Sequence, residues 1–111
     1  MAPVIDVHTH MLNNDYLALL EAHAGPKITL KTVVGGLRSI HLHDAPFMTP
    51  VPEMFDYLAR IKMMDTVGID VSVISLTCPN VYWGAPEVSL QAARVMNDDM
   101  AAARERHHGR I

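Results

Sequence analysis

The chain has 111 residues, of which 50% are hydrophobic and 19% are charged, a composition that excludes an intrinsically disordered protein. Its formal net charge of −3, with acidic and basic residues interspersed, argues against a nucleic-acid or anionic-membrane surface. No apolar stretch approaches the roughly 18 residues of a membrane span. The single cysteine, Cys78, excludes an intrachain disulfide and fits a reducing compartment, so we expect a soluble, cytoplasmic protein.

The first elements are predicted from apolar spacing and capping residues. Residues 4–8 are predicted to form a short buried strand, because apolar residues fall on both of its faces, as in a parallel strand covered on both sides. A helix through residues 16–22 follows, with Asn13 or Asn14 as its N-cap.

A β-hairpin is predicted next. Two runs that alternate between apolar and polar residues, at 28–34 and 37–42, lie on either side of Gly35 and Gly36. The prolines that follow, beginning with Pro46, indicate an irregular stretch.

The second half of the chain has the pattern of a helix, a strand and another helix. Apolar residues lie along one helical face after residue 53, up to Gly68, which can end that helix in a left-handed conformation. Residues 71–76 are rich in β-branched side chains, which predicts a second strand, and a turn-rich loop at 77–84 follows. The last helix is predicted at 86–106, because proline is favoured at the first helical position.

Strands that alternate with long helices predict an α/β fold with parallel βαβ architecture. A (β/α)8 barrel has about 250 residues and eight such units, whereas this chain contains two strand–helix units. We therefore predict that residues 1–111 are the incomplete N-terminal part of a single (β/α)8 TIM barrel domain, with a β-hairpin excursion after the first strand.

His8 and His10 end the first predicted strand and are candidate metal ligands. Side chains alternate along a strand, so both imidazoles lie on one face, about 6.6 Å apart along the backbone. Two neutral imidazoles at this spacing can converge on one zinc ion, with Zn–N bonds of roughly 2.0–2.1 Å. A catalytic zinc site needs about three protein ligands and an open position, and this motif supplies two of them. Asp6 is interpreted as a supporting or structural residue and is not counted as a ligand.

Other candidate residues have competing interpretations. His41 and His43 repeat the spacing, but no buried apolar run precedes them, and we interpret them as a solvated hairpin edge. Arg38 could clamp a substrate carboxylate through two parallel hydrogen bonds or be a surface residue. Trp83 could line a pocket for a planar substrate or pack its loop onto a neighbouring element, and both alternatives stay open.

The sequence of residues 4–10, Val-Ile-Asp-Val-His-Thr-His, resembles the first-strand metal motif of the amidohydrolase superfamily. Residues 63–76, 92–100 and 109–111 resemble the branch of that superfamily that contains aminocarboxymuconate-semialdehyde decarboxylase and related amidohydrolase 2 proteins. The resemblance spans essentially the whole chain but only the N-terminal third of a member of that branch.

The resemblance implies a (β/α)8 barrel in which His8 and His10 bind a divalent metal, usually zinc. It places the remaining ligands and the acid–base residue on later strands, so no catalytic residue is expected within this chain, which alone is expected to be inactive. It also places Arg38 near an arginine that contacts the substrate carboxylate. For the full-length protein it implies a homodimeric decarboxylase of a small unsaturated or aromatic carboxylic acid.

Two alternatives to the decarboxylase remain at this point. A metal-dependent hydrolase of an amide or lactone, cleaving a C–N or C–O bond, would use the same scaffold and the same metal ligands. An inactive fragment or an interaction module is the other alternative, because unpaired sheet edges favour self-association or pairing with a partner.

Overall fold

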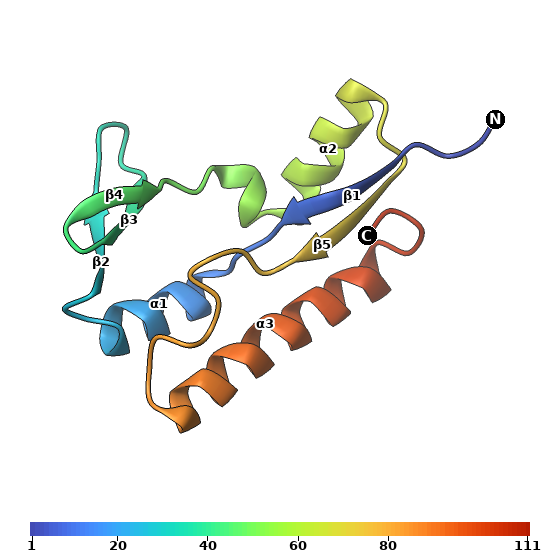
Figure 1. The fold of residues 1–111 in the computed structure, drawn as a ribbon. Coiled ribbons are helices and arrows are strands. Elements are labelled where there is room, and N and C mark those ends of the chain that lie inside the picture. The colour runs from blue at the N-terminus through green and yellow to red at the C-terminus, as the bar shows by residue number, and fades with distance from the viewer.

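The computed structural model describes residues 1–111 as three α-helices, one short 3-10 helix and five strands (Figure 1). In chain order these are β1 (Ile5–His10), α1 (Asn14–His23), β2 (Ile28–Thr32), β3 (Arg38–Leu42), β4 (Ala45–Met48), the 3-10 helix η1 (Pro52–Met54), α2 (Tyr57–Val67), β5 (Val71–Ser75) and α3 (Pro86–Arg106). The helices are too short or too polar to form a membrane span.

The helix ends follow local sequence signals. Asn13 is the N-cap of α1, and its side chain accepts a hydrogen bond from a first-turn N–H at 2.7 Å. Gly68 ends α2 in the left-handed conformation, with φ of 76°, and Pro86 begins α3. These predictions are confirmed. The helix expected after residue 53 begins later than predicted, because Asp56 caps it through bonds to two N–H groups at 2.9 and 3.2 Å.

The strands form two separate sheets. β1 and β5 pair in parallel, while β2, β3 and β4 form an antiparallel sheet in that order. The predicted hairpin is confirmed as β2 and β3, but a third strand follows where an irregular stretch was expected. That strand contains Pro46, which a sheet tolerates at an edge because the missing N–H needs no partner there.

The predicted fold class, the N-terminal part of a (β/α)8 barrel, is wrong. The chain is an α/β domain with one two-stranded parallel sheet and one three-stranded antiparallel sheet. The excursion after the first strand is a three-stranded sheet that shares the largest buried cluster with α1 and α3, so it is an integral layer of the domain. Sequence spacing did not reveal this, because the pairing of β4 depends on contacts with β3 that periodicity does not encode.

Two buried clusters meet at the end of β1. The larger one joins α1, the antiparallel sheet and α3, and consists of Leu12, Tyr16, Leu17, Leu20, Ala24, Ile28, Ile40, Ala92 and Met96. The smaller one joins α2 to α3 and consists of Met11, Tyr57 and Ala103. Met11 and Leu12 directly follow β1, and both are fully buried. The end of β1 is therefore fixed from both sides.

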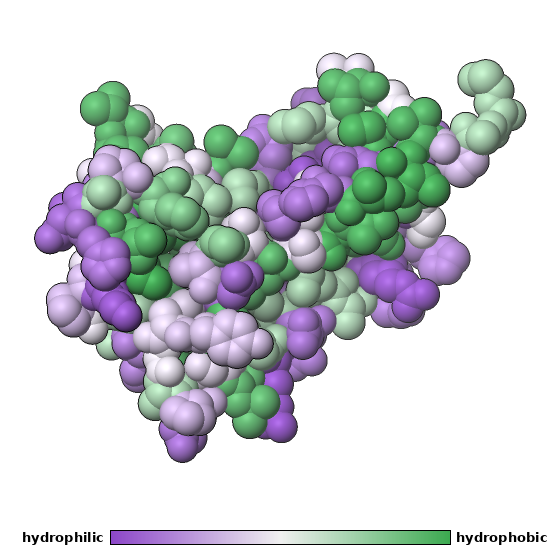
Figure 2. Space-filling view, viewed as in Figure 1, coloured by the Kyte–Doolittle hydropathy of each residue, from purple (hydrophilic) through white to green (hydrophobic).

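The parallel sheet is covered on one face only. Thr9 and Ser72 are buried against α2, and α2 and α3 flank the strand pair (Figure 1). Ile5, Val7 and Val73 are 49%, 75% and 51% exposed, and Figure 2 shows a broad apolar area over this part of the molecule. The expectation that the first strand is covered on both faces is therefore wrong.

The Asp56 cap gives a test of how α2 begins. Replacing Asp56 by Ala removes the acceptor for two first-turn N–H groups and should lower the free energy of unfolding by about 1 kcal/mol, measured by urea denaturation. Asp56→Ser retains a capping oxygen and should retain most of that stability. Equal losses in the two variants would contradict this role.

Candidate metal centre

His8 and His10 bring their imidazoles together at the end of β1. Their Nε2 atoms lie 3.1 Å apart, at hydrogen-bond distance, and the two rings meet edge to face at 84°. A tetrahedral zinc ion with two Zn–N bonds of about 2.05 Å would hold its two nitrogens about 3.3 Å apart. The pair therefore already has nearly the separation of two ligands of one ion. The predicted convergence of the two rings is confirmed, and metal binding stays a prediction.

A bulge in β1 lies beside this pair. Asp6 pairs with Ser72 and Thr9 pairs with Ile74, so β1 has one residue more than β5 between the two pairings. Such a bulge turns a strand locally and re-aims its side chains. The Asp6 carboxylate accepts a hydrogen bond from the backbone N–H of His8 at 3.1 Å. Asp6 thus has a structural role at the bulge.

Strand β5 holds the other side of the His10 ring. His10 Nδ1 lies 3.1 Å from Ser75 Oγ and 3.3 Å from the Ser75 carbonyl oxygen. A carbonyl can only accept, so this contact favours the tautomer with the proton on Nδ1 and the lone pair on Nε2, toward His8. Metal-binding histidines commonly donate their second N–H in this way. Ser75 was not predicted from the sequence, where its only signal is its place at the end of the second predicted strand.

The chain supplies an incomplete metal site. No group of three or more His, Cys, Asp or Glu side chains is arranged to hold a metal ion. Neutral imidazole nitrogens at this separation suit zinc, but a catalytic zinc site takes about three protein ligands. His8 and His10 therefore fit two positions of such a site.

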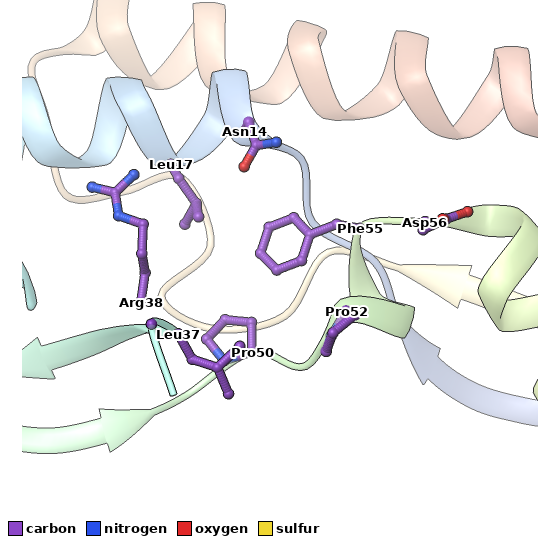
Figure 3. A pocket seen from close by; sticks show the side chains of 9 residues that line it. Asn14, Leu17, Leu37, Arg38, Pro50, Pro52, Phe55 and Asp56 are labelled. Carbon is purple, nitrogen blue, oxygen red and sulfur yellow. The ribbon is translucent and has the colours of Figure 1, made fainter. Parts of the chain in front are cut away.

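Arg38 does not join the histidine pair. Its Nη2 donates to Glu21 Oε2 at 2.7 Å, and the two side chains are 40% and 56% exposed. It lies at the edge of a cavity of about 360 Å³, into which Leu17 and Phe55 point (Figure 3). The lining of this cavity includes neither histidine. These contacts favour the surface role of Arg38, and substrate binding by it stays a prediction.

Trp83 packs its loop onto α1. The indole Nε1 donates to the Asn80 carbonyl at 2.7 Å, and Tyr16 Oη donates to the same carbonyl at 2.5 Å. The two aromatic rings lie edge to face with centroids 6.0 Å apart. Of the two alternatives for Trp83, these contacts favour packing of the loop.

His41 is buried, so the prediction of a solvated edge is wrong for this residue. It is 8% exposed, and neither ring nitrogen has a hydrogen-bond partner. The reason is that β3 is the central strand of its sheet, where His41 lies between Thr29 on β2 and Pro46 on β4. His43, in the following turn, is exposed as expected.

No family model matches the chain. Among solved structures, the chain is similar to the apo form of the Metarhizium anisopliae enzyme IDCase, with a TM-score of 0.80 and 26% sequence identity. The match covers 97% of this chain and 33% of that enzyme, so the chain spans about a third of the enzyme's length. The chain is therefore similar in structure to part of an enzyme.

Tyr16 provides a pH-dependent test of the loop contact. Burial raises the pKa of Tyr16 to about 12, and the contact with Trp83 lowers this pKa by less than burial raises it. A tyrosine in the unfolded chain ionises near its usual pKa of about 10. Because the folded state favours the protonated hydroxyl, its contribution to stability is complete below about pH 10. This contribution should be lost as the pH rises from about 10 to about 12. Urea unfolding should show a steeper loss for the wild type than for Tyr16→Phe, and equal pH slopes would contradict the assignment.

Proposed function

We propose that this chain supplies two ligands, His8 and His10, to a divalent metal ion, zinc being the best match, in a metal-dependent enzyme. The observation that carries the proposal is the 3.1 Å separation of the two Nε2 atoms. The contacts of Ser75 with His10 Nδ1 support it, because they favour a lone pair on Nε2. Similarity to an enzyme over nearly the whole chain supports the enzymatic part of the proposal.

The chain's own residues bind and orient in this proposal. A divalent ion would supply a Lewis acid that polarises the substrate. His8 and His10 would hold it, and Ser75 would fix the ring of His10. The exposed face of β1 and β5 would receive the substrate and any further ligands, since no third His, Cys, Asp or Glu side chain lies close enough to complete the site.

For the reaction, we propose decarboxylation of a small unsaturated or aromatic carboxylic acid. The support is the resemblance of residues 4–10, 63–76 and 92–100 to the amidohydrolase 2 branch. Hydrolysis of an amide or lactone with the same ligands is the alternative. An assay of a longer protein that contains this chain should release carbon dioxide from such acids, whereas ester or amide cleavage without carbon dioxide would favour the hydrolase.

An interaction module is the second candidate. Ile5, Val7 and Val73 expose an apolar strip on the parallel sheet, and such patches commonly mark association surfaces. Self-association of the zinc-free chain, weakened by Val7→Lys, would support this candidate, and a monomer at all concentrations would oppose it.

The metal ligands are tested by alanine substitution. His8→Ala should sharply reduce the zinc retained by the untagged protein after reconstitution and desalting, measured by mass spectrometry, because one donor is lost. His43→Ala is the matched control, since His43 is exposed in a turn. His41→Ala should also retain zinc, but its burial makes a check of folding necessary. Equal loss of zinc in the His8 and His43 variants would defeat the assignment.

A further inference from the structure

A cation from α2 holds the residue between the two histidines. Thr9 is 7% exposed, and its Oγ1 accepts a hydrogen bond from Arg60 Nη1 at 2.6 Å. Arg60 Nη2 donates to the backbone carbonyl of His10 at 2.8 Å. One guanidinium therefore binds both the Thr9 side chain and the His10 carbonyl.

This contact limits the rotation of the strand end. A guanidinium is a planar, rigid fork, and its bonds are charge-assisted. Two bonds from one fork fix the orientation of the Thr9–His10 segment better than a single bond would. Side chains alternate along a strand, so Thr9 is held on the covered face while His8 and His10 extend toward the uncovered one.

The hydrogen bonds of Arg60 favour a role in the site beyond the joining of α2 to the sheet. Its Nε is buried and has no hydrogen-bond partner, whereas both terminal nitrogens bond to β1. A buried donor without a partner is destabilising. Polar groups that lack a partner are expected where a residue serves a functional site and not stability alone.

We propose that Arg60 is a positioning residue for the metal-binding pair. By clamping Thr9 and the His10 carbonyl, it keeps the Nε2 atoms of His8 and His10 at the separation of two ligands of one ion. The inference rests on the proposed metal site. Arg60 and Thr9 would then contribute to the metal affinity without contacting the ion.

The test compares zinc affinity among variants of the whole untagged chain. Thr9→Val removes the hydroxyl with little change of shape and should weaken zinc binding about ten-fold by calorimetry, the low end of effects seen when supporting partners of metal ligands are lost. Thr9→Ser keeps the hydroxyl and should restore the affinity. Arg60→Lys loses the fork and should resemble Thr9→Val.

Matched controls and a metal-free measurement separate positioning from stability. Thr32→Val and Arg94→Lys change exposed residues of the same types and should bind zinc as the wild type does. Imidazole nitrogen NMR of the zinc-free protein should show His8 and His10 signals displaced in Thr9→Val, but not in Thr9→Ser, while the unfolding midpoint reports stability.

The outcomes for this inference and for the proposed function differ. If the wild type binds no zinc, the proposed function fails, and the zinc-free imidazole spectra still decide whether Arg60 positions the pair. If the wild type binds zinc but Thr9→Val and Arg60→Lys bind it equally well, with unchanged imidazole signals, the positioning role is overturned. A loss of stability without a loss of affinity would overturn it as well.

Discussion

The clamp of Arg60 on the end of β1 is the interaction on which the candidate site depends. Its two bonds, to Thr9 and to the His10 carbonyl, join α2 to a strand some fifty residues earlier in the sequence. Directly after this point, Met11 and Leu12 enter two different buried clusters. A parallel pair of only two strands gives its members little support, so these anchors determine where the strand end lies.

Because side chains alternate along a strand, the two faces at the end of β1 have different roles. Thr9 faces the covered side and contributes to the fold, while His8 and His10 face the uncovered side and are available for chemistry. Ser75 on β5 holds one histidine, and Asp6 holds the backbone of the other. Two imidazoles are thus arranged before any ion binds, which reduces the cost of ordering them.

Features that depend on neighbouring residues were predictable from the sequence, and features that depend on distant ones were not. The Asn13 cap, the left-handed Gly68 and the start of α3 at Pro86 follow from local chemistry. The convergence of His8 and His10 follows from the period of a strand. Other features depend on pairing between distant residues. These are the burial of His41, the third strand of the antiparallel sheet and the roles of Ser75 and Arg60. The expected barrel was wrong for the same reason.

In the proposed site, one metal ion is bound by both His8 and His10. The decisive measurement is anomalous diffraction at the zinc absorption edge from crystals of the untagged chain soaked in a zinc salt. One peak is expected roughly 2.0–2.1 Å from the Nε2 atoms of both residues. Zinc bound only at other histidines, such as His43 or His108, with none between this pair, would contradict it.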